Sequence, residues 1–273
     1  MREHRRTGFT HLLRILVIAY LGLLVVWPVA LVAISTFSRG VQPVLDTFAQ
    51  PEVQFAFQLT AVSAFWAVLI NTVFGVTISL LLVRARFPGR RLLSALIDLP
   101  LSVSPVVVGL ALLLVYSNRT GWFGPALERL GLQIVYAPAG IVLATAFVSL
   151  PLVVREVVPV LSEIGTDAEQ AARSLGAGAV QTFWRITLPG IRWGVVYGVV
   201  LSLARSLGEF GAVKVVSGGV ALRTQTATLL VEERYQQFGA ANTVTAYTAA
   251  LVLALIAVVA LVVVAALRPE RRP

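Results

Sequence analysis

The chain alternates between long apolar runs and short stretches rich in arginine. Six runs reach or approach the length of a membrane span: Ile15–Ile34, Thr60–Val83, Leu99–Ser117, Ile134–Val154, Trp193–Val216 and Thr243–Leu267. A helix needs about 20 apolar residues to cross the hydrocarbon of a bilayer. The pattern therefore predicts an all-α integral membrane protein built as a six-helix transmembrane bundle.

Composition supports the same fold class. Of the 273 residues, 58% are apolar and 13% are charged, whereas a soluble protein usually carries about 25% charged residues. The net charge of +9 raises nucleic acid as a partner, but the basic residues form short clusters between apolar runs. Such clusters are what the positive-inside rule produces, so we expect membrane lipid around the chain and no nucleic acid.

Several kinds of chemistry are excluded by residue type. The chain has no cysteine, and its two histidines, His4 and His11, lie near the N-terminus. A membrane-embedded enzyme would need clustered histidines, cysteines or acids to bind a metal or activate a nucleophile. We therefore expect no metal site, no catalytic residue and no enzymatic activity of the chain by itself.

The basic residues also predict an orientation. Fifteen of the 22 lysines and arginines lie on the side of the predicted bundle that carries both termini, which makes that side cytoplasmic. The first apolar run exceeds the roughly 7–15 residues of a signal-peptide core, so we expect an uncleaved helix. Between the first two spans, Gly40–Gln58 is predicted as an amphipathic or irregular outer loop, with Pro43 and Pro51 as breakers.

The loop between spans four and five, residues 155–192, carries the most information. Thr166 or Asp167 is a candidate N-cap for a helix that ends at Gly176, where a left-handed residue can close it. A second short helix, 179–186, is predicted to end before Pro189. The resulting knob has more apolar residues than a solvated loop needs. It either lies on the membrane surface or docks into a groove of a partner protein.

Residue spacing in this loop matches a known pattern. Gln170-Ala171-Ala172 is followed after three residues by Gly176, after nine more by Ile186, and then by Leu188-Pro189. This spacing resembles the EAA loop of ABC-importer permeases, with Gln170 in place of the usual glutamate and Glu169 just before it. The resemblance implies an ATPase-coupling loop formed by these residues: Glu169, Gln170, Ala171, Ala172, Gly176, Ile186, Leu188 and Pro189.

A wider resemblance covers most of the chain from about Phe57. Residues 154–159, 191–201, 204–213 and 217–219 resemble the W-type subunit of bacterial sulfate/thiosulfate permeases, and Gly-Glu-Phe-Gly-Ala at 208–212 also occurs in molybdate permeases. The resemblance implies a type I ABC-importer permease domain over 57–267, preceded by a segment 1–56 with the first helix and followed by a tail 268–273. It also implies a bacterial inner-membrane location.

The same resemblance implies partners. These are a second permease subunit of the T type, two cytoplasmic ATPase subunits, and a sulfate-binding protein outside the cytoplasm. The chain lacks a Gly-x-x-x-x-Gly-Lys-Ser/Thr sequence, so it has no phosphate-binding loop of its own. We expect ATP to be bound by the partner subunits and no cofactor to be bound by this chain.

Charges inside the fifth span mark a candidate translocation path of Arg205, Glu209 and Phe210. Arg205 lies roughly 18 Å along a helix from Trp193, and Glu209 lies four residues further on the same helix face. Ionisable groups at such depth face a bundle interior or a wet path. The pair either assists the passage of an anion or only stabilises the packing of the helices. Lys214 either steers anions or snorkels, and Gly208 and Gly211 allow close approach or local unwinding.

Alternatives remain at this stage. The substrate is sulfate, thiosulfate, molybdate or tungstate. An ion-coupled secondary anion transporter would use broken helices and a buried acid, for which Glu209 is the main candidate. A membrane scaffold would leave the spacing of the loop unexplained.

Overall fold

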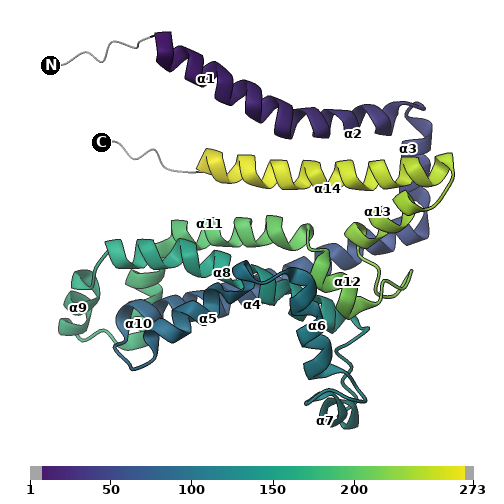
Figure 1. The fold of residues 1–273 in the computed structure, drawn as a ribbon. Helices are drawn as coiled ribbons and strands as arrows, with labels where there is room; N and C mark the ends of the chain where they lie inside the picture. Colours follow the sequence, from purple (N-terminus) through teal and green to yellow (C-terminus); the bar gives the residue numbers. More distant parts are fainter. Residues whose placement is uncertain (1–7, 268–273) are drawn as a thin grey trace.

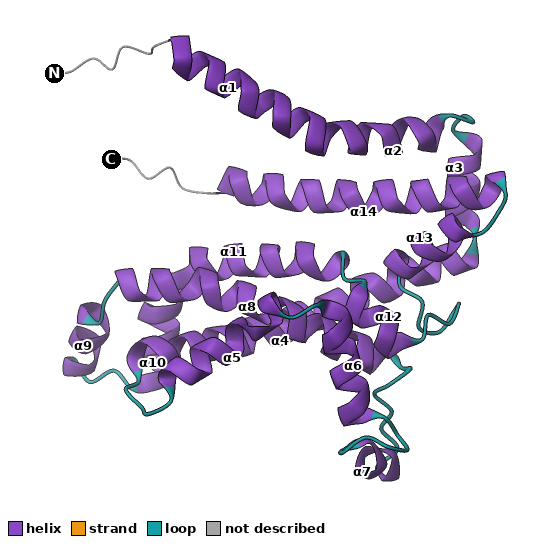
Figure 2. Cartoon of the chain, in the orientation of Figure 1, coloured by secondary structure: helices purple, strands orange, loops and turns teal. Residues whose placement is uncertain are grey.

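The computed structural model describes residues 8–267, and within them every regular element is a helix (Figure 1, Figure 2). The tail 268–273 and the arginines before residue 8 lie outside the described residues. The helices are α1 (Gly8–Leu21), α2 (Trp27–Phe37), α3 (Gln42–Ala49), α4 (Pro51–Arg84), α5 (Arg90–Ser102), α6 (Pro105–Tyr116), α7 (Gly124–Arg129), α8 (Pro138–Glu163), α9 (Asp167–Ser174), α10 (Ala179–Thr182), α11 (Leu188–Leu207), α12 (Gly211–Ser217), α13 (Ala227–Gln236) and α14 (Ala240–Leu267).

Five helical stretches of the described residues are long and apolar enough to cross a membrane: His11–Phe37, Pro51–Arg84, Pro138–Glu163, Ala179–Leu207 and Ala240–Ala260. The sixth predicted span is a bent pair, α5 and α6, whose axes differ by 113°. Six spans are therefore confirmed when the pair counts as one, and the third of them, predicted as Leu99–Ser117, is bent within that range. Pro105 explains the break, because it pushes Ser104 to extended backbone with ψ of 135°.

Prolines elsewhere were predicted to break helices, and they do not. Pro51 begins α4, and Pro43 lies in the first turn of α3, so most of the predicted outer loop is helical. A first-turn proline costs little because its missing N–H would have no partner there. α8 continues through Pro151 and Pro159, so the first nine residues of the predicted 155–192 loop are still helix.

The fifth span also differs from its prediction. The second helix of the loop does not end before Pro189 but runs on through a π-helical turn, Phe183–Thr187, into α11. A π turn ahead of a proline accommodates the missing backbone donor. α11 then ends at Leu207, and α12 starts only at Gly211. The local unwinding considered for the glycines at 208 and 211 is thus present.

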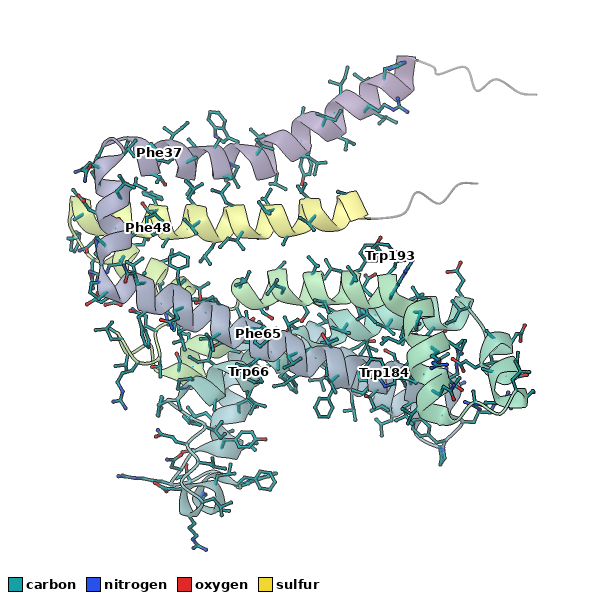
Figure 3. All side chains as sticks on the ribbon, turned by 180° about the vertical axis from the view of Figure 1, so that it is seen from behind. Phe37, Phe48, Phe65, Trp66, Trp184 and Trp193 are labelled. Atoms are coloured by element: carbon teal, nitrogen blue, oxygen red, sulfur yellow. The ribbon has the colours of Figure 1, made fainter. Side chains whose placement is uncertain are left out.

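The bundle is held by close packing of α4, α8 and α11 around a buried cluster of Val76, Val153, Val157, Leu161 and Ile191. α14 lies beside α2 and α11, and α1 begins at the same end of the bundle as α9, where α14 also ends (Figure 1). We call this the basic end. Large apolar side chains such as Phe65 and Trp66 cover the outer surface (Figure 3), as expected of helices that face lipid.

Candidate functional site

The knob at the basic end is built from α9, α10 and the π turn. Gly176 adopts φ of +86°, and the Ala177 N–H donates to the Ala172 carbonyl at 3.0 Å. This is the hydrogen-bond pattern of a glycine-terminated helix, so the predicted stop at Gly176 is present. A Cβ at this position would meet nothing within 4 Å. Backbone conformation, and not space, therefore requires the glycine.

The outward face of the knob carries large exposed apolar side chains. Leu175, Val180 and Trp184 are 89%, 73% and 62% exposed. A cavity of about 390 Å³ lies on the knob. Another cavity, of about 420 Å³, lies between α4 and α11 and is lined mainly by apolar side chains. The residues lining the knob cavity are Ala172, Leu175, Gly176, Ala177, Gln181, Thr182, Arg185 and Ile186. This concave, partly apolar surface has the form expected of a docking site for another protein.

The residues predicted for coupling divide into an outer and an inner group. Gln170 and Ala171 are exposed, and the Gln170 amide donates to the Thr166 hydroxyl at 2.8 Å. Thr166 is the N-cap residue, but its hydroxyl caps no backbone N–H. Leu188 and Phe183 pack against the buried cluster in the bundle. Pro189 is exposed at the start of α11.

Glu169 belongs to the inner group. It is 7% exposed, and its carboxylate pairs with the Arg84 guanidinium, with Nε–Oε2 at 3.1 Å and Nη2–Oε1 at 3.2 Å. The Thr187 hydroxyl donates to Oε1 at 2.9 Å. Sequence analysis placed Glu169 in the coupling loop and did not foresee these partners, because Arg84 lies 85 residues earlier.

Arg205 and Glu209 meet, although they are not on one continuous helix. Arg205 Nη1 lies 2.6 Å from Glu209 Oε2, and the other oxygen, Oε1, accepts the Ala212 N–H at 3.0 Å. The Glu209 carboxylate thus bridges the end of α11 and the start of α12. The Glu209 side chain is almost wholly buried, whereas that of Arg205 is 37% exposed. Both carboxylate oxygens of Glu209 are thus engaged within the chain, as its packing interpretation requires. Part of the Arg205 guanidinium remains accessible.

Phe210 and Lys214 also have partners. Phe210 packs against a buried cluster that includes Leu59 and Leu229. The Lys214 ammonium lies 5.3 Å from the centre of the Phe210 ring and forms an ion pair with Glu232 of α13. Phe210 is therefore held as a packing residue, and the lysine is tied to a neighbouring helix.

Sequence analysis missed a polar ladder that joins α4, α8 and α11. The Asn71 amide donates to the Ser149 hydroxyl at 2.8 Å and to the Ser202 hydroxyl at 3.4 Å, and Ser149 lies 3.2 Å from the Ser206 hydroxyl. All four residues are buried. The available signal was an asparagine inside an apolar run and two serines four residues apart on the fifth span. Ser206 of this ladder is the residue next to Arg205 in the sequence.

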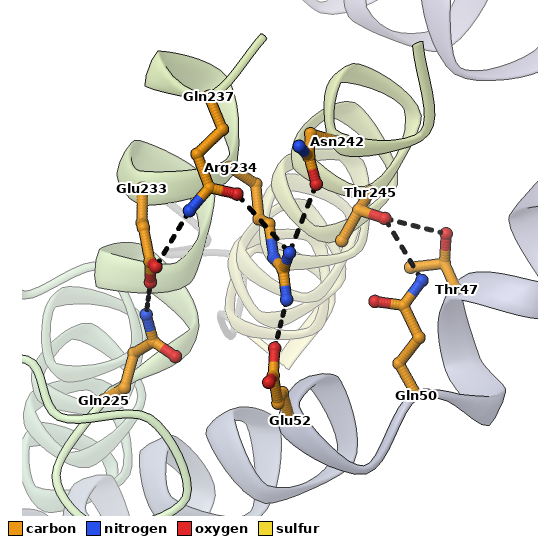
Figure 4. Close-up of polar contacts among 9 residues, drawn as sticks. All are labelled: Thr47, Gln50, Glu52, Gln225, Glu233, Arg234, Gln237, Asn242 and Thr245. Atoms are coloured by element: carbon orange, nitrogen blue, oxygen red, sulfur yellow. Dashed lines mark hydrogen bonds and ion pairs between the residues drawn. The ribbon is translucent and has the colours of Figure 1, made fainter. Parts of the chain in front are cut away.

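A second polar cluster lies at the opposite end of the bundle (Figure 4). Arg234 of α13 forms an ion pair with Glu52 at the start of α4 and donates to Asn242 Oδ1 at 3.1 Å. Gln50 Nε2 donates to Thr245 Oγ1 at 3.4 Å. The starts of α4 and α14 are thereby fastened to α13. Among residues 8–267, no group of three or more His, Asp or Glu side chains gathers to hold a metal ion.

Together, the fold and the site define a class: a multi-span membrane protein with an exposed knob that is continuous with one of its membrane helices. The chain belongs to the family of binding-protein-dependent transport system inner membrane components, whose model matches residues 71–273. The six-helix bundle is of the type I ABC-importer permease kind, and the chain is a transport component of the inner membrane, not an enzyme by itself.

Known proteins agree with this assignment. The chain is 50% identical to "Sulfate transport system permease protein CysW" of Synechococcus elongatus, covering 91% of this chain and 85% of the relative. It is 42% identical to the CysT permease protein of Escherichia coli, covering 71% and 69%. A bacterial ABC transporter that imports alginate has the same fold, with a TM-score of 0.76, 17% identity and coverage of 96% and 97%.

Proposed function

We propose that the chain is the membrane-spanning permease subunit of an ATP-driven sulfate/thiosulfate importer. Its helices form part of the translocation path, and the knob couples them to ATPase subunits. The exposed apolar face of the knob, around Leu175 and Trp184, is the observation that carries this proposal. A surface of this kind is stabilised by a protein partner.

The knob also has the rigidity that coupling requires. The Gly176 turn is closed by backbone hydrogen bonds, and the second helix of the knob is continuous with α11. A push on the knob is therefore delivered to a membrane helix without an intervening flexible loop. Within this proposal Gln170, Ala171, Ala172 and Ile186 form the contact surface, Glu169 and Leu188 support it from behind, and Pro189 begins the membrane helix that continues from it.

Orientation and partners follow from the same proposal. The arginine bias puts the basic end in the cytoplasm, and the structure has the start of α1 and the end of α14 at that end. The expected assembly pairs this W-type chain with a T-type permease, two cytoplasmic ATPase subunits that bind ATP, and a sulfate-binding protein on the outer side. Relatives named CysW and CysT match this chain with similar identity, which supports two homologous permeases in one complex.

Sulfate is the substrate that the named relatives favour, and molybdate or tungstate is the alternative. The test is uptake of labelled sulfate into vesicles that contain the chain with its companion subunits, with and without ATP, and with competing molybdate. ATP-dependent uptake that molybdate barely inhibits supports the proposal. Strong inhibition by molybdate would reassign the substrate, and uptake driven only by an ion gradient would overturn the ABC mechanism in favour of a secondary transporter.

Two glycines offer matched variants for the coupling step. Gly176 has φ of +86°, whereas Gly178 has φ of −69°, and a Cβ at either position meets nothing within 4 Å. Gly176→Val should distort the knob because a β-branched residue is strained in the left-handed region. We expect it to abolish uptake, while Gly178→Val retains it. Equal uptake by the two variants would contradict coupling through this turn.

A further inference from the structure

The carboxylate of Glu169 joins three segments that are far apart in the sequence. It lies in the first turn of α9, and it contacts Arg84, the last residue of α4, and Thr187, which immediately precedes α11. The Arg84 guanidinium also donates from Nη2 to the carbonyl of Gly165 at 2.6 Å. The Glu169 carboxylate therefore fastens α9 to the end of α4 by an ion pair and to the residue before α11 by a hydrogen bond.

This carboxylate is not free to meet a partner protein. Both of its oxygens are engaged inside the chain, and the Arg84 side chain is only 19% exposed. Its neighbours in α9 behave differently, because Asp167 and Gln170 are exposed. Adjacent residues of one short helix thus face opposite directions, one into the bundle and one outward.

The surroundings of the ion pair fix the direction in which a displacement of α9 is transmitted. Arg84 ends a helix of 34 residues, about 51 Å long, where a cation also interacts favourably with the helix dipole. Planar guanidinium contacts fix orientation as well as distance. A displacement of α9 is consequently transmitted to the long axis of α4 and to the start of α11 together.

Resting on the function proposed above, we propose that Arg84, Glu169 and Thr187 form a clamp that converts movement of the knob into joint movement of α4 and α11. These are positioning residues that act behind the docking surface. Without the clamp, the knob still binds the ATPase subunits through its exposed face and stays continuous with α11, but movement of α9 no longer reaches α4, so the two membrane helices do not move together. ATP hydrolysis then proceeds with little transport.

The first test measures sulfate uptake and ATP hydrolysis in vesicles that contain the complete complex. Glu169→Gln keeps the side-chain shape and removes the charge, and Asp167→Asn, the same kind of change at an exposed acid of α9, is the matched control. We expect Glu169→Gln to lower the ratio of uptake to hydrolysis about tenfold, and Thr187→Val to lower it about threefold, while Asp167→Asn changes it less than twofold. The charge swap Arg84→Glu with Glu169→Arg should recover part of the ratio.

The outcomes of this test are distinct. A normal ratio in assembled Glu169→Gln and Thr187→Val complexes would overturn the clamp. So would failure of even the mild Thr187→Val variant to assemble, because the three residues would then serve folding alone. If the intact complex hydrolyses ATP and imports another oxyanion, the proposed substrate is wrong, and the same ratio measured with that anion still decides on the clamp.

A second test needs neither substrate nor ATP. The chain contains no cysteine, so spin labels can be attached to cysteines placed at two exposed sites, Ser174 of α9 and Thr77 of α4. The distance distribution between the labels should be narrow in the intact chain and at least twice as wide with Glu169→Gln. An unchanged width would overturn the clamp even if the chain proved not to be an importer.

Discussion

Two close helix contacts in the bundle converge on Val153 of α8, and they give a prediction that can be worked from distances. A Cβ at Gly198 of α11 would lie 2.9 Å from Val153 Cα, a backbone atom. A Cβ at Gly75 of α4 would lie 2.7 Å from Val153 Cγ1, a side-chain atom. Carbon atoms in favourable contact are about 3.5–4.0 Å apart, so neither position has room for a methyl group.

Both Gly198→Ala and Gly75→Ala should therefore destabilise the protein, by about 1–3 kcal/mol for an overpacked interior. At about 2–4 °C per kcal/mol for a chain of this size, the thermal midpoint should fall by roughly 2–12 °C. The measurement is thermal unfolding of the purified complex in detergent at one fixed heating rate. Gly178→Ala is the control, because its Cβ meets nothing within 4 Å and its φ is −69°.

A double-mutant cycle separates the two contacts. Val153→Ala removes Cγ1 but keeps Cα and Cβ. It should relieve part of the strain of Gly75→Ala, whose new methyl group would still lie 2.9 Å from Val153 Cβ, and little of that of Gly198→Ala, whose methyl group would meet Cγ1 only at 3.4 Å. We expect a favourable coupling of about 1 kcal/mol for the first pair and additivity within about 0.5 kcal/mol for the second. Equal rescue of both glycine variants, or an unchanged midpoint for Gly198→Ala, would refute the reasoning.

Three further predictions concern the polar groups in the bundle. Asn71→Leu removes two interhelical hydrogen bonds, each worth about 0.6–1.7 kcal/mol in a membrane, so the thermal midpoint should fall while Thr77→Val, on the exposed face of α4, leaves it unchanged. Arg205→Gln should destabilise the complex by about 1–2 kcal/mol, because Glu209 is buried and loses its ion pair while Arg205 is partly exposed; wild-type uptake by an assembled variant would exclude a role of the arginine in anion passage. Lys214→Gln breaks an exposed ion pair and should change stability by less than about 1 kcal/mol, and a larger loss would show that this pair is essential.

The sequence predicted the number of spans because burial of backbone groups in lipid requires long apolar helices. It also predicted the stop at Gly176, since a left-handed helix end favours glycine. Proline was the main source of error. A proline can end a helix, begin one or lie inside one. Which of these occurs at Pro51, Pro105 and Pro189 depends on the conformation of neighbouring turns, which the local sequence does not specify.

The candidate site was predictable only in its local part. The knob follows from spacing within about 20 residues, whereas the contacts of Glu169 with Arg84 and of Asn71 with Ser149 join residues 85 and 78 positions apart. Such pairs depend on how the spans pack. The small-residue spacing of Gly194 and Gly198 was a readable sign of close helix approach, and it identifies the face of α11 that lies against α8.

The two helix breaks have a consequence for how solvent isotopes label the chain. Gly211 at the start of α12 lies against Pro105 at the start of α6, with 3.0 Å between a Cβ at 211 and the proline Cβ, so the two breaks are neighbours. The first N–H groups of a helix have no acceptor one turn back, and exchange with water is fastest where backbone hydrogen bonds are missing. Deuterium should consequently enter the chain early near residues 106–107 and 210–211, far apart in sequence and adjacent in space, while the long helices on either side remain protonated for much longer.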